Sequence, residues 1–594
     1  MVAYFLRGSK RFFAMGIICS VTVAFLDMIG PKIVQYTVDH ILGNETGAPQ
    51  VVSYFINLGG GREYLRSNLY IIAAVVALLA LFGGICRYLY RVFNSKGSEH
   101  LIKRMRDELF DQIQHLPLTW HGANHTGDII QRCTSDVETI KNFLSEQLMN
   151  LFRVGILIVL GMYFMIGING RMAFISGIFI PIVILYSVFF HNKIAGAFLH
   201  ADEEEGKLSS IAQENLTGVR VVRAFGREQY ERERFETQNH GYTLMWIRLM
   251  GLLSAFWCSN DFITGFQIML IVVFGAVFCV KGWLTVGEYI AFVSYNGMLS
   301  WPVRELGRII SDMSKAGISV DRIRYIMNSE REKDYPDVST KPLGDKPLDI
   351  EFDNVTFSYD GTEDILKNVS FKIPAGTTLG VLGATGSGKS TLAYLLNRLY
   401  ELPEGNGSIR IGGRDIRLVD RHELRRYIGL VLQEPFLFSG TIAGNISITN
   451  PGHPNMDKVR KAARTASLDE TINRFNDGYD TYVGERGVTL SGGQKQRTAI
   501  AQMVATDPPV MIFDDSLSAV DTQTDAVIRS NLKETVKGTT VILISHRITT
   551  LMRADNIIVL DRGRIVEQGT HDELVNMDGL YRKIFDIQTS GALQ

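Results

Sequence analysis

The stretch Leu379–Leu396, LGVLGATGSGKSTLAYLL, decides the fold of the C-terminal part of this chain. An apolar segment typical of a buried strand leads into the pattern Gly-x-x-x-x-Gly-Lys-Ser from Gly383 to Ser390, and a helical pattern follows. Glycines let backbone N–H groups turn toward phosphate oxygens, and the start of the helix adds the positive end of its dipole. The stretch therefore predicts a phosphate-binding loop between a strand and a helix.

This loop predicts where a nucleotide and a magnesium ion bind. We expect Lys389 to reach the terminal phosphates and Ser390 to bind Mg²⁺. The residues expected to surround the nucleotide phosphates are Gly383, Ala384, Thr385, Gly386, Ser387, Gly388, Lys389, Ser390 and Thr391.

A second metal-binding position follows in the segment VMIFDDSLSAVD, which begins at Val510. An apolar strand ends there at Asp514, whose carboxylate is placed to hold Mg²⁺ directly or through water. These two motifs alone are compatible with any phosphate-loop NTPase.

The segment LSGGQKQR, 490–497, narrows the class of phosphate-loop NTPase to which the chain can belong. Its glycines form another turn that opens a helix, which makes a second anion-binding helix end that the first nucleotide does not need. It is best explained as serving a nucleotide held by a second domain of the same type, so it predicts a dimer. The residues expected to face that partner nucleotide are Leu490, Ser491, Gly492, Gly493 and Gln494.

The composition separates two parts of the 594-residue chain. Hydrophobic residues make up 46% and charged residues 21%, and the long apolar runs fall in the first 320 or so residues. The net charge of −1 gives no support for nucleic-acid binding, which would require a strongly basic face. Runs of about 20 apolar residues cross a bilayer as helices. Six are expected, at residues 12–36, 69–93, 151–168, 172–190, 250–280 and 289–310.

The long connections 94–150 and 191–249 are rich in Lys and Arg, which places them in the cytoplasm with the N-terminus. Each bends at a segment with loop chemistry, 116–128 and 215–228, and we expect short helices there to contact the soluble domain. Three prolines mark the charged linker before that domain. The predicted parts are a membrane domain at 1–328, a linker at 329–347 and a nucleotide-binding domain at 348–594.

Together these motifs resemble an ATP-binding-cassette (ABC) exporter half-transporter, with six spans followed by one cassette over essentially the whole chain. The resemblance implies an α-helical membrane domain fused to an α/β ABC ATPase in the cytoplasmic membrane, with ATP and Mg²⁺ as cofactors. It implies further roles: Tyr359 stacks on adenine, Gln433 links the metal, the attacking water and the membrane domain, and His546 lies near the terminal phosphate. Ser518 and Asp521 are expected to contact the opposite cassette.

Asp515 departs from the family pattern, which has glutamate after the metal-binding aspartate. A general base must come within about 2.6–3.2 Å of the water it polarises, and the shorter side chain holds its carboxylate back. The sequence therefore predicts a site that binds ATP and hydrolyses it slowly. Related heterodimeric exporters pair such a site with a competent one, so a different half-transporter is the expected partner. Three alternatives stay open: a homodimer that tolerates Asp515, an ATP-gated channel and an importer.

The transported substrate is expected to be a small amphipathic compound, drug-like or lipid-like. Asp27 and Asp261 fall within spans one and five, where an ionised aspartate must face protein or water. Both are candidates to line an inner chamber and attract cationic amphiphiles. The alternative is structural, in which each carboxylate caps a kinked helix or pairs with a basic residue.

Overall fold

A computed structural model of the chain describes residues 2–43, 45, 49–332, 343, 348–450, 452–516, 521–535 and 538–590. These form two compact units. One comprises Met1–His115 and His125–Ser329, and the other comprises Leu116–Asn124 and Glu330–Gln594.

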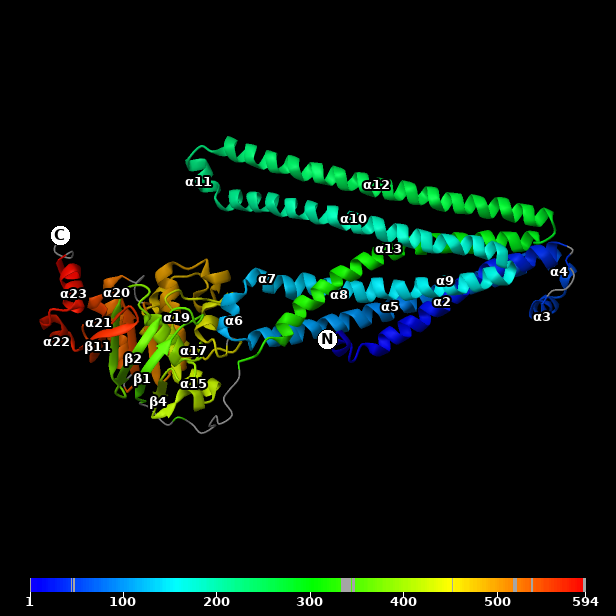
Figure 1. Ribbon diagram of the computed structural model, residues 1–594. Helices are drawn as coiled ribbons and strands as arrows, with labels where there is room; N and C mark the ends of the chain where they lie inside the picture. The colour runs from blue at the N-terminus through cyan, green and yellow to red at the C-terminus, as the bar shows by residue number, and fades with distance from the viewer. Residues whose placement is uncertain are drawn as a thin grey trace. The chain divides into compact units, whose positions relative to one another are not determined.

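The first unit is helical, with long rods of up to 53 residues (Figure 1). Its elements, with π-helical segments marked η, are α1 Val2–Phe5, α2 Lys10–Tyr36, η1 Thr37–Leu42, α3 Gln50–Leu58, α4 Arg62–Ser67, α5 Tyr70–Gln114, α7 Thr126–Gln131, η2 Arg132–Asp136, α8 Val137–Asn142, η3 Phe143–Gln147, α9 Leu148–Ile168, α10 Gly170–Thr217, α11 Val219–Ala224, α12 Glu228–Val280 and α13 Val286–Asn328.

Five helical segments of the described chain are long and apolar enough to cross a membrane: Lys10–Leu42, Tyr70–Gln114, Thr126–Ile168, Gly170–Thr217 and Glu228–Val280. They contain the first five predicted spans. The sixth, 289–310, lies in α13, which is not among the five, so the count of six is not confirmed. The helices run on far beyond bilayer length, as expected for the two long connections.

Short helices occur at both predicted bends, α6 Leu118–Ala123 at the first and α11 at the second. The segment Leu116–Asn124, which includes α6, belongs to the same compact unit as the nucleotide-binding domain. The expected contact of the first bend with the soluble domain agrees with this grouping. Helix α11 belongs to the helical unit.

Polar side chains tie α10, α12 and α13 together within the apolar unit. Ser176 and Gln267 both donate to the Asn296 side-chain oxygen, each at 2.8 Å. All three residues are buried. Because a polar group without a partner is costly in an apolar interior, this bonded set favours one register of the three helices.

The start of α13 is fixed against the end of α2. Asp39 in η1 accepts hydrogen bonds from the Thr285 hydroxyl at 2.6 Å and from the Gly287 amide at 2.8 Å. Thr285 and Glu288 also form a reciprocal capping box. A Cβ on Gly287 would lie 2.5 Å from the Asp39 carboxylate, so glycine is required for this approach. The free N–H groups of the first turn are thereby satisfied.

The second unit is an α/β domain built on two main sheets, with a small two-stranded sheet, β7-β8, in addition (Figure 1). A six-stranded sheet has the order β12-β11-β3-β10-β9-β6, parallel except for β12, and a four-stranded antiparallel sheet has the order β2-β1-β4-β5. The strands are β1 Ile350–Phe357, β2 Leu366–Ile373, β3 Thr378–Gly383, β4 Ser408–Ile411, β5 Arg414–Asp415, β6 Ile428–Val431, β7 Gly440–Thr441, β8 Tyr482–Val483, β9 Val510–Asp514, β10 Thr540–Ser545, β11 Asn556–Asp561 and β12 Arg564–Gly569.

Helices cover these sheets, and the described apolar core forms three clusters. They are α14 Lys389–Leu396, α15 Arg421–Tyr427, α16 Ile442–Ile446, α17 Met456–Thr465, α18 Asp469–Ile472, α19 Gly492–Thr506, α20 Thr522–Thr535, α21 Ile548–Leu551, α22 His571–Asn576 and α23 Leu580–Ser590, with 3₁₀ turns at Ile416–Leu418, Gly478–Asp480 and Glu485–Gly487. Leu392 and Leu396 of α14 pack in the cluster between the two sheets, whereas Leu490 packs with α17 and α19 in a second cluster. The two glycine-rich motifs thus rest on different parts of the core.

Candidate nucleotide-binding site

The predicted nucleotide-binding residues gather at one edge of the six-stranded sheet. Strands β3, β10, β9 and β6 are neighbours and parallel, so their carboxyl ends meet at this edge. The phosphate loop follows β3, His546 follows β10, Asp514 ends β9, and Gln433 lies two residues beyond β6. Ligands of open α/β sheets bind at this edge, so the sheet order places these residues where the chemistry requires them.

The phosphate loop has the close backbone geometry that its glycines predict. Gly386 and Gly388 have φ values of 82° and 99°, a region that favours glycine. A Cβ on Gly383 would lie 2.4 Å from the Leu560 carbonyl oxygen. The Oγ of Ser387 is buried, and the described residues offer it no hydrogen-bond partner. A phosphate oxygen is a fitting acceptor for that hydroxyl, so the loop suits the group that the sequence predicts.

Lys389 is partly buried and Asp514 is buried. The Lys389 ammonium donates to the carbonyls of Gly383 at 2.9 Å and Ala384 at 2.8 Å. Burial lowers the pKa of Lys389, and the nearby carboxylates of Asp514 and Asp515 oppose this shift. Burial also raises the pKa of Asp514, although a hydrogen bond from Ser390 opposes it. A cation held by Asp514 would offset the cost of burying its carboxylate.

Asp515 is held between two strands. Its backbone N–H donates to the Ile544 carbonyl at 2.9 Å, and its φ of 45° is one that aspartate tolerates. Its Oδ2 lies 3.0 Å from Nδ1 of His546. The Asp515 side chain is 14% exposed and that of His546 is 56% exposed. Among the described residues, the structure therefore brings together two of the three predicted catalytic residues, Asp515 and His546, but not Gln433.

Tyr359 lies beside the loop helix. Its hydroxyl is 3.0 Å from the Thr391 hydroxyl, and its ring meets the Tyr400 ring edge-on with centroids 4.8 Å apart. Tyr359 is 41% exposed, so part of the aromatic side chain is accessible to an adenine. Burial raises the pKa of its phenol.

The signature residues form a well-made helix start away from the phosphate loop. Ser491 is the N-cap of α19 and shares a capping box with Gln494. Ser491 and Gly492 are exposed, and Leu490 is buried beneath them. This leaves the first turn of α19 open to a ligand from outside the chain.

Three other predicted residues have less defined surroundings. Gln433 is exposed after β6. Asp521 is exposed and accepts from the Thr524 amide at 2.8 Å. Ser518 lies outside the described residues.

The two membrane aspartates each pair with an arginine, the alternative that the sequence left open. Asp27 on α2 lies 2.5 Å from Arg87 on α5, and Asp261 on α12 lies 2.6 Å from Arg304 on α13. Asp261 is 67% exposed while Arg304 is 14% exposed. Sequence reasoning did not identify Arg87 or Arg304, because nothing local marks which helices face one another.

Family comparisons agree with this architecture. Residues 13–303 match the model for the ABC transporter transmembrane region, and residues 366–518 match the model described as ABC transporter. The ABC transporter ATP-binding protein YknU of Bacillus subtilis (strain 168) is 34% identical over 581 residues, covering 98% of this chain and 95% of that protein. The chain belongs to the ABC transporter family, as a half-transporter of the exporter type.

Other relatives in this family carry functional names. The putative multidrug export ATP-binding/permease protein YgaD of B. subtilis is 30% identical and covers 98% of both chains. An ATP-dependent lipid A-core flippase of Aromatoleum aromaticum is 31% identical over 86% of this chain and 84% of that protein. A solved bacterial Atm1-family ABC exporter with ATP bound superposes with a TM-score of 0.80, at 27% identity over 98% of both chains.

The ABC exporter is thus a multi-pass membrane protein whose cytoplasmic domain is an ATPase coupled to transport. The ATPase domain binds ATP, and exporters of this kind work as dimers. When bound, Mg²⁺ would neutralise charge on the phosphates, and Ser390 and Asp514 are the described residues placed to hold it. Lys389 and the loop amides would bind and orient the terminal phosphates.

Proposed function

We propose that this exporter is the slow-site half of a heterodimer that moves amphipathic compounds out across the cytoplasmic membrane. Its own nucleotide site binds ATP through the phosphate loop and Tyr359, and hydrolyses it slowly. Its signature residues, 490–494, complete a faster site whose phosphate loop belongs to a different half-transporter.

The contact between Asp515 and His546 carries this proposal. An aspartate at the position of the general base reaches one methylene less far than a glutamate, and here its Oδ2 is engaged by the His546 imidazole. A carboxylate held back in this way polarises the attacking water poorly. The other residues that we assign to nucleotide binding are present, so we expect loss of the base to affect turnover more than binding.

The intact signature supports the second half of the proposal. Ser491 caps a regular α19, and the first turn is exposed, so its free N–H groups can meet a phosphate of the partner's nucleotide. Gln433, Ser518 and Asp521 remain our candidates for metal binding and for contact across the dimer. We also propose six membrane spans, with α13 as the sixth, and domain limits at 1–328, 329–347 and 348–594.

Substrate class is proposed from the membrane domain. The relatives are named as a multidrug exporter and as lipid A-core flippases, and both substrate types are amphipathic. Asp27 and Asp261 remain our candidates for substrate contact. Since each pairs with an arginine, the chamber they would line offers both signs of charge rather than a bare carboxylate.

Hydrolysis by the purified chain tests the assembly. We expect the chain alone, in lipid nanodiscs, to bind ATP but release phosphate slowly, and co-expression with a half-transporter that has glutamate after its metal-binding aspartate to restore a typical rate. A typical transporter rate from the chain alone would support the homodimer instead. Uptake into inside-out vesicles tests the transport mode: accumulation against a gradient supports export, whereas passive flux supports a channel and the opposite direction an importer.

A further inference from the structure

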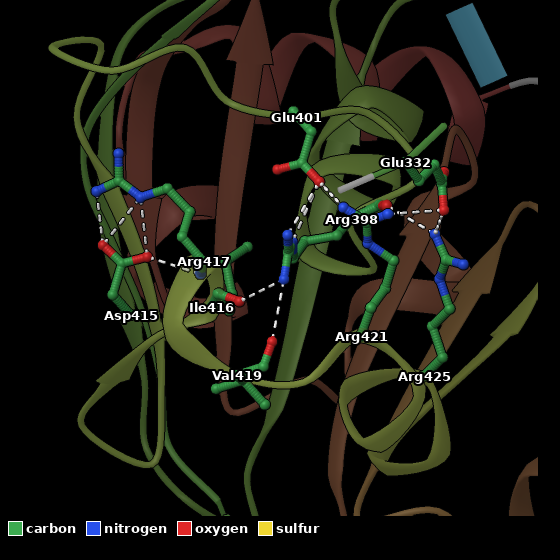
Figure 2. Close-up of polar contacts among 9 residues, drawn as sticks. All are labelled: Glu332, Arg398, Glu401, Asp415, Ile416, Arg417, Val419, Arg421 and Arg425. Carbon is green, nitrogen blue, oxygen red and sulfur yellow. Dashed lines mark hydrogen bonds and ion pairs between the residues drawn. The ribbon is translucent and has the colours of Figure 1, made fainter. Parts of the chain in front are cut away.

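The linker between the two units attaches to one short helix, α15, at both of the places where the structure describes it. The carboxylate of Glu332 lies 2.9 Å from the Arg421 guanidinium and 3.4 Å from that of Arg425 (Figure 2). Farther along, the Leu343 amide donates to Glu423 at 3.0 Å, and the Leu343 side chain is buried in the core. Three charged side chains of α15 therefore hold the linker.

The same network of charged side chains extends to the end of α14, the helix that follows the phosphate loop. Arg398 follows α14 by two residues and is 2% exposed. Its guanidinium binds Glu401 at 3.1 Å, and Arg421 binds the same carboxylate at 2.6 Å. Arg425 also donates to the Arg398 carbonyl at 2.9 Å. We call Glu332, Arg398, Glu401, Arg421 and Arg425 the linker clamp; it joins the linker to the helix that begins at Lys389 (Figure 2).

The other end of the linker is fixed as well. Gln112 in the last turns of α5 is buried and donates to the carbonyls of Ser329 at 2.8 Å and Ile326 at 3.3 Å. These are the last carbonyls of α13, so Gln112 caps that helix. Only Glu330 and Arg331 separate Ser329 from Glu332. Because this connecting segment is so short, a movement of the end of α13 is transmitted to the clamp with little loss.

We propose that the linker clamp couples α13 directly to the phosphate loop, and that Glu332 is the positioning residue on which this coupling depends. Binding of nucleotide at Lys389 shifts the conformational equilibrium of α14. The linker clamp transmits this shift to Glu332. The three-residue step from Glu332 to Ser329 then transmits it to α13. Coupling between two sites is reciprocal, so the state of α13 also biases nucleotide binding. This route is separate from the short helices at the two bends, and it does not depend on how fast the nucleotide is hydrolysed.

The charges explain why Glu332 is the residue to change. Arg421 is 8% exposed and keeps Glu401 as a partner when Glu332 is neutralised, and Arg425 keeps the Arg398 carbonyl. Glu332→Gln therefore loosens the linker and leaves the rest of the clamp bonded. Nearby, Asp415 and Arg417 form an ion pair at 2.6 Å that does not include Glu332, so Arg417→Gln is a matched control (Figure 2).

The experiment measures the response of α13 to nucleotide in the chain co-expressed with its partner in nanodiscs. An environment-sensitive fluorophore on Ile318→Cys, exposed on α13, reports the response to a non-hydrolysable ATP analogue with Mg²⁺ after the native cysteines are replaced. We expect Glu332→Gln to lower the amplitude about fivefold or more, the lower end of typical coupling. The analogue is added at a saturating concentration, established for each variant by displacement of a fluorescent ATP derivative, so that weaker binding does not lower the amplitude.

Two further results decide between coupling and simple loss of structure. Arg417→Gln should respond as the unmodified protein does, and Glu332→Asp, which keeps the carboxylate, should retain at least half of the amplitude. An unchanged response in Glu332→Gln, or equal losses in Glu332→Gln and Arg417→Gln, overturns the proposal. A Glu332→Asp variant with an unchanged Tm and no response overturns it too.

Discussion

His546 and Asp515 are hydrogen-bonded across the ends of two adjacent strands, with Nδ1 of His546 at 3.0 Å from Oδ2 of Asp515. The bond joins the ends of β10 and β9 at the edge of the sheet where β3 ends and the phosphate loop begins. It also occupies one oxygen of the carboxylate that stands where a general base is needed. Neighbouring Asp514 is more deeply buried. The two successive aspartates therefore differ in environment and in the role that we assign to them.

Lengthening Asp515 by one methylene is expected to raise ATP hydrolysis. A well-placed general base contributes about 10²–10⁴-fold, and we expect Asp515→Glu to gain about tenfold in phosphate release by the purified chain. Asp515→Asn should change the rate little, because the present carboxylate contributes little. A complete loss of hydrolysis in Asp515→Asn would show that Asp515 is already an effective base. Asp515→Glu with Lys389→Ala is the background control, since it lacks the phosphate-binding ammonium.

Neutralising Asp514 is expected to make the nucleotide-free protein more stable. Burial raises the pKa of Asp514, so the ionised carboxylate costs the folded state free energy at neutral pH. When the pKa of a carboxyl is higher in the folded state than in the unfolded state, its contribution to the free energy of unfolding is complete at acid pH. That contribution is lost as the pH rises through the folded-state pKa. Asp514→Asn should thus raise Tm at pH 7 and match the unmodified chain at acid pH. Calorimetry across pH checks this.

The same Asp514→Asn variant should lose the benefit of Mg²⁺. The unmodified chain should gain Tm when ATP and Mg²⁺ are added together, because a ligand that binds only the folded state stabilises it. The variant should gain less from Mg²⁺ while still responding to ATP alone. A gain from Mg²⁺ equal to that of the unmodified chain would contradict our assignment of Asp514 to the metal.

The nucleotide site was predictable from sequence because its chemistry is local. The turn from Gly383 to Ser390 requires glycines within a few residues, and Asp514 ends an apolar strand in the same segment. The convergence of these segments then follows from a parallel sheet, whose carboxyl ends share one edge. Five spans were predictable for a similar reason, since bilayer thickness sets their length.

Contacts between distant segments were not predictable. Glu332 and Arg425 are 93 residues apart, and Asp27 and Arg87 are 60 apart. Charged side chains of this kind occur throughout the sequence, so only the packing of elements selects the pairs. The sixth span is hard to recognise from sequence for a related reason. Helix α13 carries charged residues such as Arg304 and Glu305, which are costly in an apolar setting. Their partners lie on α12 and α9 and offset this cost.

Breaking the ion pair between Asp261 and Arg304 is expected to lower stability in an unequal way. Asp261→Asn leaves Arg304, 14% exposed, without its carboxylate, and the cost of an unpaired buried group is about 1–3 kcal/mol. Arg304→Gln leaves an exposed carboxylate and should cost less. The double variant Asp261→Asn with Arg304→Gln should recover most of the loss. Thermal unfolding in detergent measures all three.

The pair Asp27 and Arg87 is the matched control for Asp261. Its arginine is 59% exposed, so Asp27→Asn should lower Tm less than Asp261→Asn. Export of a fluorescent cationic dye from cells then separates structure from substrate contact. If Asp261 contacts the dye, export falls in the double variant even though its Tm has recovered. Unchanged export there would assign the pair a structural role.

The signature residue Gly492 and the phosphate-loop residue Lys389 should have unequal effects on the assembled dimer. A Cβ at Gly492 meets no atom outside its own stretch of helix within 4 Å, so we expect Gly492→Asp to leave the fold of α19 intact. Its carboxylate would repel a phosphate of the partner's nucleotide at an exposed helix start. We expect Gly492→Asp to lower ATPase activity of the dimer about 100-fold, in the range for a lost transition-state donor, and Lys389→Ala to lower it less than about fivefold. Gly492→Ala, equally unhindered, should be mild. Equal losses in Gly492→Asp and Lys389→Ala would mean that both sites turn over alike, which is the behaviour of a homodimer.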